Sequence, residues 1–293
     1  MRNNKLIISA VSVIVLMFLV SGCTSKVKIR ASDQIFTDNH VSRIAIFSEG
    51  KVQWPGLGKG GPYIILPSCL QANENILTKT TQVLKDKGYE VVCAEPVGIA
   101  YNCKSWWYLE DIEARDDESA YKQIEDVKPT FIYPKFRDAS DYNKALHNVI
   151  NDMEAAILSK SLSSFAPHKS DIEVLHRETG ADTICLQRVY GVKYSTARKV
   201  GSVIAGVALS LLSPGAFVAS PNDRVEAFYI FVDATTGNVL WQHGLYTTGN
   251  PLDPDQSYVE NVLQFFPAKN MPFDDKVCVK GEDGLYYCQE KGE

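Results

Sequence analysis

Residues 224–246 read R-V-E-A-F-Y-I-F-V-D-A-T-T-G-N-V-L-W-Q-H-G-L-Y and predict two strands joined by a tight turn. Residues 224–233 and 239–246 are rich in β-branched and aromatic side chains, which strands favour. Between them, Gly237 and Asn238 supply the positive φ angles that a hairpin turn needs. We therefore predict a β-hairpin here and interpret the rest of the chain as the elements that precede and follow it.

Strands and helices alternate before this hairpin, and one helix follows it. A stretch at 50–62 has five glycines and two prolines and is expected to be a loop. Ser68 is the expected cap of the first helix, and Gly88 its stop. Strands are predicted at 41–47, 89–93 and 184–192, and helices at 70–87, 140–159, 171–179 and 255–266. This order fits one α/β layered domain over residues 41–267, with helices packed on a mixed sheet.

A segment at 94–138 interrupts the alternation and is interpreted as an insertion. It is acidic near its middle and carries an aromatic run, Trp106, Trp107 and Tyr108. Two interpretations of this run stay open. Exposed aromatic side chains mark partner surfaces, which makes the three residues a candidate partner surface, whereas buried ones form a core beneath the insertion.

Residues 1–22 have the three parts of an export signal. Two basic residues come first, residues 6–20 are apolar, and Ser21 and Gly22 are small. The apolar run is about fifteen residues long, whereas a helix that spans a membrane needs about 20. The pattern favours a signal peptide over a membrane-spanning anchor.

The residues L-V-S-G-C at 19–23 resemble the lipobox of bacterial lipoproteins. The resemblance implies cleavage before Cys23, a thioether from its sulfur to diacylglycerol, and a further acyl chain such as palmitate on its amino group. Thr24 stands where an aspartate would retain such a protein in the inner membrane. We therefore expect an anchor in the outer membrane, a domain in the periplasm, and a lipidated tether at 23–40.

Six further cysteines indicate disulfides, because an even number in an exported chain is typical of an oxidising compartment. Cys278 and Cys288 flank a G-E-D-G turn, and a hairpin there sets them opposite each other. Cys93 and Cys103 are ten positions apart across the loop that follows a predicted strand. These are the two candidate pairs, and the first closes a C-terminal hairpin tail at 268–293.

Cys69 and Cys185 either pair or stay as buried thiols. A zinc site is the competing interpretation of the cysteines. The chain has no C-x-x-C pair, and no histidine falls at ligand spacing from a cysteine. We therefore expect no metal.

The segment at 200–219 is uncharged and mostly apolar, and it contains Gly201, Gly206 and Pro214. Its length approaches a membrane span, but the glycines and the proline weaken that interpretation. A buried helix and turn is one alternative. Membrane contact or a self-association surface is the other.

The charge pattern and the motifs indicate no nucleic-acid partner, no cofactor and no enzyme. The formal net charge is −5, and no cluster of lysine and arginine offers a path for phosphates. Lys59 lies in a glycine-rich run without the Ser or Thr of a phosphate loop. Cys103 before two tryptophans is only faintly similar to a papain-type nucleophile, and a disulfide explains it better. His243 is expected to be a surface or packing residue, and Asp233 a turn cap.

Four features together resemble a family of envelope lipoproteins. They are G-A-D-T-I at 180–184, the apolar, glycine-bearing segment at 200–219, the hairpin sequence D-x-x-T-G-x-V-L-W at 233–241, and Phe-Pro at 266–267. This family in turn resembles the amino-terminal domain of the Tol β-propeller protein, the curli-secretion lipoprotein and auxiliary lipoproteins of envelope transporters. The resemblance implies an assembly or binding part and supplies no catalytic residue.

Two functional hypotheses follow. The first is a non-enzymatic component of the cell envelope that binds other proteins through the sheet edge, the aromatic run or the apolar segment. The second is an oligomeric subunit of a secretion pore or transporter, in which residues 200–219 contact the membrane.

Overall fold

The protein forms two compact units in a computed structural model, one from Arg30 to Phe273 and one from the two ends of the chain, Met1–Ile29 and Asp274–Glu293. The structure describes residues 26–32, 41–55, 63–100, 106–108, 121–122, 130–136, 138–159, 165–196, 198–199, 221–269, 278–281 and 286–289.

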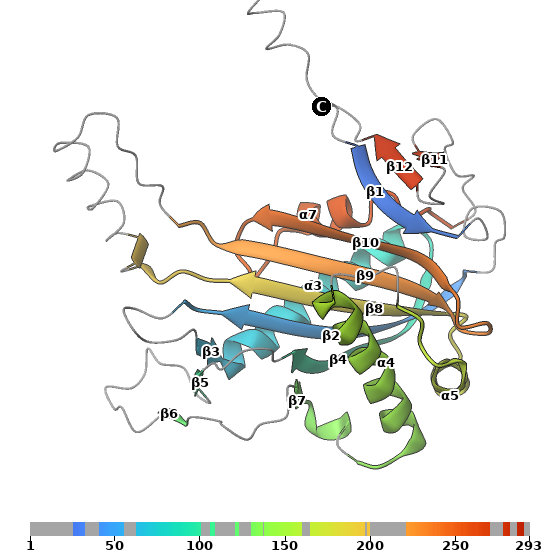
Figure 1. The fold of residues 1–293 in the computed structure, drawn as a ribbon, viewed down its shortest axis with the longest axis horizontal. Helices are drawn as coiled ribbons and strands as arrows, with labels where there is room; N and C mark the ends of the chain where they lie inside the picture. The colour runs from blue at the N-terminus through green and yellow to red at the C-terminus, as the bar shows by residue number, and fades with distance from the viewer. Residues whose placement is uncertain are drawn as a thin grey trace, which may run out of the picture. The chain divides into compact units, whose positions relative to one another are not determined.

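A mixed sheet forms the centre of the larger unit (Figure 1). Its strands run in the order β10-β9-β8-β2-β4-β7. β2 is parallel to both of its neighbours, β4 and β8, whereas the β8–β9, β9–β10 and β4–β7 pairs are antiparallel. The strands are β2 (Arg43–Gln53), β4 (Glu90–Ala100), β7 (Thr130–Ile132), β8 (Thr183–Val192), β9 (Arg224–Asp233) and β10 (Val239–Thr248). The predicted α/β fold with helices on a mixed sheet is confirmed.

Helices cover both faces of this sheet (Figure 1). One face carries α3 (Leu66–Asp86) and α7 (Gln256–Val262), and the other carries α4 (Asp141–Leu158) and α5 (Lys169–Thr179). On the α4 and α5 face, the core joins Phe47 of β2 and Leu186 of β8 to side chains of both helices. Side chains of a strand alternate between faces, so each central strand contributes to both cores.

Two boundaries in the first half of the sheet differ from the sequence-based prediction. β2 continues through Gln53 into the expected loop, because it pairs with β8 from Ile44 through Gln53. α3 begins at Leu66 rather than after Ser68, and Ile65 occupies the cap position without a side-chain bond. Pro67 explains the early start, since proline fits the first helical turn, where its missing N–H costs nothing.

The insertion begins later than expected, because β4 runs to Ala100. A separate three-stranded sheet of β3 (Tyr63–Ile65), β5 (Trp106–Tyr108) and β6 (Tyr121–Lys122) contains the aromatic run. β3 and β5 are parallel, and β5 and β6 are antiparallel. A 3-10 helix at Pro134–Phe136 precedes α4.

The smaller unit is a sheet built from the two ends of the chain. β11 (Cys278–Lys280) pairs with β12 (Tyr286–Gln289), and β12 pairs with Lys26–Ile29 of β1 (Lys26–Ala31). β1 lies inside the expected tether at 23–40. Its sequence K-V-K-I-R-A alternates basic and apolar residues, which is the period of a strand and was overlooked in that interpretation.

No helix in the described part of the chain is both long and apolar enough to cross a membrane.

Candidate functional site

Asp182, from the G-A-D motif, holds the start of β2. Its carboxylate accepts hydrogen bonds from the backbone N–H groups of Ser42, at 3.0 Å, and Arg43, at 2.9 Å. The glycine before it, Gly180, ends α5 with a φ of 67°, a left-handed conformation that glycine adopts without a steric penalty. The motif therefore turns the chain from α5 into β8 and joins β8 to β2.

Asp233, from the hairpin motif, caps the turn between β9 and β10. Its Oδ1 accepts hydrogen bonds from the N–H groups of Thr235 and Thr236 at 2.9 and 2.6 Å. Gly237 follows with a φ of 77°. The prediction that Asp233 caps a turn is confirmed, and the predicted hairpin is present.

Trp241, at the end of the same motif, is completely buried. Its ring lies edge-on to Phe231 and Phe266, with centroids 5.6 and 5.5 Å apart. Phe266 in turn stacks on Phe231 at 4.0 Å. Backbone carbonyls of the Phe-Pro pair accept hydrogen bonds from the side chains of Lys87 and Tyr89. The motifs that carry the family resemblance therefore have structural roles in this fold.

His243 lies on β10 and is partly exposed. Its ring contacts the ring of Trp241 edge-on, with centroids 5.9 Å apart, and Phe265 in the same way at 6.5 Å. These ring contacts agree with the predicted packing role.

A buried cluster of charges lies between the sheet and α4, and sequence reasoning missed it. Arg188 of β8 is 3.4 Å from a carboxylate oxygen of Glu49 on β2 and 3.3 Å from one of Glu154 on α4. The side chains of Arg188 and Glu154 are 9% exposed, and that of Glu49 is fully buried. Lys51, two residues after Glu49, places its Nζ 5.6 Å from the ring centre of Tyr190.

The Glu49 carboxyl group of this charged cluster differs from an exposed one. Burial raises the pKa of Glu49 well above its ordinary value of 4.5, and the nearby charge of Glu154 raises it further. The charge of Arg188 acts in the opposite direction but does not cancel the effect of burial. Glu49 is therefore protonated over part of the pH range in which an exposed glutamate is ionised.

The charged cluster lies toward the carboxyl ends of parallel strands β2 and β8, where α/β proteins commonly bind ligands. Its contacts join β2, β8 and α4, so it fixes the position of that helix. The sequence does indicate this cluster, because the residues on this face of β2, which are two apart, change from apolar to charged. In β2, Ala45 and Phe47 are followed at the same spacing by Glu49 and Lys51.

Asp223 forms a second polar group at the point where β8 and β9 leave the sheet. Its carboxylate is 2.9 Å from the Nζ of Lys193 and 2.8 Å from that of Lys199, and it accepts a bond from the N–H of Tyr194. Burial opposes ionisation, but the bonds from Lys199, Tyr194 and Lys193 lower the pKa of Asp223. These bonds hold together the described residues on both sides of the segment at 200–219.

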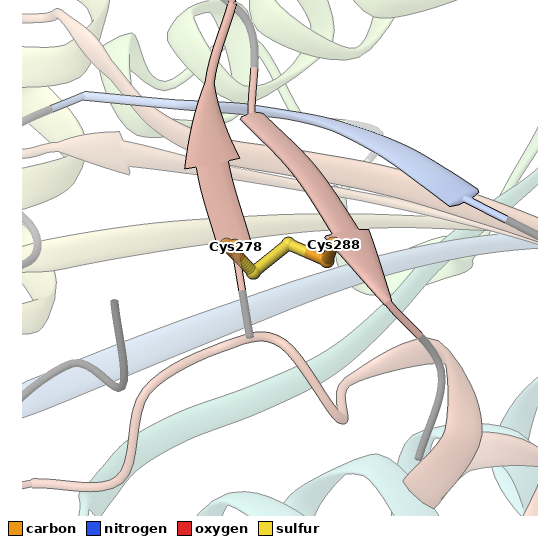
Figure 2. The surroundings of a disulfide bond; sticks show 2 residues. All are labelled: Cys278 and Cys288. Atoms are coloured by element: carbon orange, nitrogen blue, oxygen red, sulfur yellow. A yellow bond between two sulfur atoms is a disulfide. The ribbon is translucent and has the colours of Figure 1, made fainter. Parts of the chain in front are cut away.

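Cys278 and Cys288 form a disulfide across β11 and β12, as predicted (Figure 2). The two residues lie directly opposite each other in the strand register. Cys93 has a free thiol, so the predicted pair of Cys93 and Cys103 is not formed, and Cys103 lies outside the described residues. Cys93 lies on β4 beside Glu95, and burial together with that charge raises its pKa to about 11.

Cys69 and Cys185 are buried free thiols. Of the two alternatives for them, a disulfide or buried thiols, the second is therefore correct. The Sγ of Cys69 is 3.2 Å from both the N and the O of Val52. In the part of the chain that the structure describes, no group of three or more His, Cys, Asp and Glu side chains is arranged to hold a metal ion.

Several predicted functional residues cannot be placed. Cys23, Thr24, Lys59 and the segment at 200–219 lie outside the described residues. The backbone of Trp106, Trp107 and Tyr108 forms β5, but their side chains are not described. Of the three predicted interaction surfaces, only the sheet edge can therefore be compared with the structure.

β10 is not the edge of the sheet, because β1 follows it in the strand order. Arg30 and Ala31 of β1 pair with Gln242 and Trp241 at its beginning. Tyr246 lies near the other end of β10. Tyr246 is 53% exposed there. A groove of about 160 Å³ lies at this end of the strand, with Val225, Leu245, Thr247, Tyr258 and Asn261 in its wall.

No protein-family model matches this chain, and a search of curated proteins finds no match either.

Proposed function

We propose that this protein is a lipid-anchored component of the cell envelope that binds other proteins and is not an enzyme. Acyl groups on Cys23 hold it on the outer membrane, and the α/β unit faces the periplasm. The observation that carries the proposal is the exposed side chain of Tyr246 near the groove at the end of β10, because exposed aromatic side chains and grooves mark partner surfaces.

The disulfide supports the proposed location. Disulfides persist in oxidising compartments such as the periplasm and are rare in the cytosol. Cys278 and Cys288 join two short strands in the smaller unit, where Ile29 and Tyr286 are the other buried apolar side chains that the structure describes. A covalent link is a common way to stabilise such a unit after export.

The structural roles of the family motifs support the proposed class of protein. Asp182 and Asp233 accept backbone hydrogen bonds, and Trp241 packs in the core. Residues used in this way stabilise the fold and do not form a reactive site. A fold stabilised in this way suits an envelope protein that binds other proteins or assembles with them. The resemblance itself stays part of the proposal.

The anchor is tested by metabolic labelling with an alkyne analogue of palmitate. We expect label on the unaltered protein and none on the Cys23→Ser variant, which lacks the acceptor sulfur. Equal labelling of both proteins would contradict the anchor.

Binding is tested by cross-linking in cells, extraction of the full chain in detergent, and mass spectrometry of the proteins that purify with it. We expect an envelope protein that is enriched with the unaltered chain relative to Cys23→Ser. Recovery of the same background proteins from both would contradict a binding role at the membrane.

The alternative is an oligomeric subunit of a secretion pore or transporter that uses residues 200–219. The ion pairs of Asp223 favour it, because they fix the chain on both sides of this uncharged segment. Size-exclusion chromatography with light scattering on the detergent-extracted protein tests it. We expect a defined oligomer, and a monomer at all concentrations would exclude this alternative.

A further inference from the structure

The small sheet of β1, β12 and β11 has one buried face and one open face. Four side chains on one face are buried, namely Ile29, Cys278, Tyr286 and Cys288. Val279 follows Cys278 in β11, so it points to the opposite face, where it is 66% exposed. Tyr287 lies directly opposite Val279 in the strand register and is partly exposed. The open face therefore carries an apolar and an aromatic side chain next to each other.

The proposed anchor lies close to this face along the chain. Cys23 is three residues before Lys26, the first residue of β1, and an extended chain spans at most about 11 Å over that length. Lys28 of β1 lies opposite Tyr287, and neighbouring strands are about 5 Å apart. Val279 is therefore within about 20 Å of the cysteine to which the acyl chains are attached.

We infer that the open face of this small sheet lies against the phospholipid surface of the membrane that holds the Cys23 anchor. Single exposed apolar residues are common on protein surfaces. Here the anchor limits how far the face can be from the bilayer, and valine and tyrosine are suited to the level of the headgroups, where they lose contact with water. The inference deepens the proposed function, and it rests on that proposal for the anchor.

The sequence of β1 fits the same surface. Residues 24–30, the part of the described sheet that follows the anchor, include Lys26, Lys28 and Arg30 and no acidic residue. A lysine near a bilayer packs its aliphatic chain along apolar surface, whereas its ammonium group reaches the phosphates. Basic residues at this distance from the anchor favour a phosphate-bearing lipid surface as the occupant of the face.

The disulfide keeps Val279 on the open face. Its bond between Cys278 and Cys288 fixes the pairing of β11 with β12 at the position next to Val279. A shift of this pairing by one residue would turn Val279 to the buried face. The covalent link therefore secures the register that the membrane contact needs.

The contact is tested with a photoreactive residue, p-benzoylphenylalanine, in place of Val279 in the full chain. Cells are grown with radioactive phosphate and irradiated, and the protein is then purified in detergent. The diacylglycerol of the anchor contains no phosphorus, so radioactivity on the protein reports cross-linking to phospholipid. We expect at least ten times more label than with the same probe in place of Tyr246. That position is the matched control, because its side chain is 53% exposed and belongs to the larger unit.

Two results of this experiment would overturn the inference. One is equal label at the two positions, or no label above that of a sample kept in the dark. The other is cross-linking of the probe at 279 to a protein and not to lipid, which would identify a different occupant of the face.

The chemistry of the face is tested by Val279→Glu in a chain that carries the probe in place of Tyr287. We expect at least fivefold less phosphate label, because a carboxylate at 279 loses its hydration and is repelled by the phosphates. Tyr246→Glu in the same probe background is the control and should leave the label unchanged. Melting temperatures establish that both variants are folded. Unchanged label in Val279→Glu would contradict a contact through this face.

The outcomes separate this inference from the proposed function. Palmitate label on the unaltered chain without phosphate label at 279 contradicts the inference alone. Phosphate label at 279 without palmitate label contradicts the anchor and supports the contact. Recovery of no envelope partner contradicts the binding role alone.

Discussion

The face of the sheet beneath α4 and α5 has two halves that differ in chemistry although they share the same strands. Ala45, Phe47, Ile184 and Leu186 make one half apolar and completely buried. The other half begins with Glu49 and contains the charged cluster, which is buried almost as well. Burial alone therefore does not reveal which half is apolar. The first half is stabilised by removing apolar surface from water, whereas the second depends on charges that compensate each other.

The largest expected effect comes from the apolar half. Phe47→Ala removes a fully buried ring that lies edge-on to Tyr142 of α4, with centroids 6.4 Å apart. We expect a loss of about 3–5 kcal/mol in the free energy of unfolding, because transfer of the ring and the remaining cavity both act against the fold. Urea denaturation measures it. The loss should be the same at pH 5 and pH 8, and a strong dependence on pH would contradict an apolar role.

The next effect comes from the charged half. Arg188→Ala leaves the carboxyl groups of Glu49 and Glu154 buried without their shared cation. We expect a loss of about 3 kcal/mol near neutral pH, reduced at acid pH as Glu49 becomes protonated. Denaturation at several pH values measures it. Arg177→Ala is the matched control, because Arg177 is exposed on α5 and forms a surface ion pair with its neighbour Glu178.

A smaller effect is expected at the end of the sheet opposite the charged cluster. Asp182→Ala removes the acceptor of the Ser42 and Arg43 N–H groups. We expect a loss of about 2 kcal/mol, since two backbone donors lose a charged acceptor at a partly exposed position. Hydrogen exchange should also become faster at Ser42 and Arg43. Unchanged exchange at those amides would show that the carboxylate does not hold β2.

The smallest expected effect is on the pH dependence of stability. It comes from Glu49, and Asp223, the other carboxyl group with a shifted pKa, serves as the control. Glu49 in the unfolded chain titrates near 4.5, but burial raises its pKa in the folded protein. Between these two pKa values the folded protein keeps a proton that the unfolded chain has released, so stability falls as the pH rises. Glu49→Gln removes this fall, and we expect it to stabilise the protein by about 1 kcal/mol at pH 8 relative to pH 4.

Asp223→Asn is the control for the direction in which stability changes with pH. The pKa of Asp223 is lowered in the folded protein, so its contribution is present above the pKa of the unfolded chain and is lost as the pH falls through the folded value. Melting temperatures between pH 3 and pH 8 measure both variants. If Glu49→Gln and Asp223→Asn changed the pH dependence in the same direction, the assignment of the two groups would be wrong.

The sequence predicted the β9–β10 hairpin with the observed bounds of β9 and the role of Asp233, because a turn is specified by residues that are neighbours in the chain. It also predicted the disulfide of Cys278 and Cys288, since a hairpin sets such a pair opposite each other. The pairing of Cys93 with Cys103 was wrong because the strand of Cys93 continues to Ala100. The charged cluster was missed because its members are far apart in sequence.

The sequence by itself determined the alternation of strands and helices, the hairpin turn and the export and lipidation pattern from which we infer the envelope location. These features depend on short-range spacing and local chemistry. Only the tertiary structure decided that Asp182 holds β2, that Arg188 joins two glutamates from different elements, and that β2 lies between β8 and β4. Each of these depends on the order of strands in the sheet, which is set by long-range packing and not by any one segment.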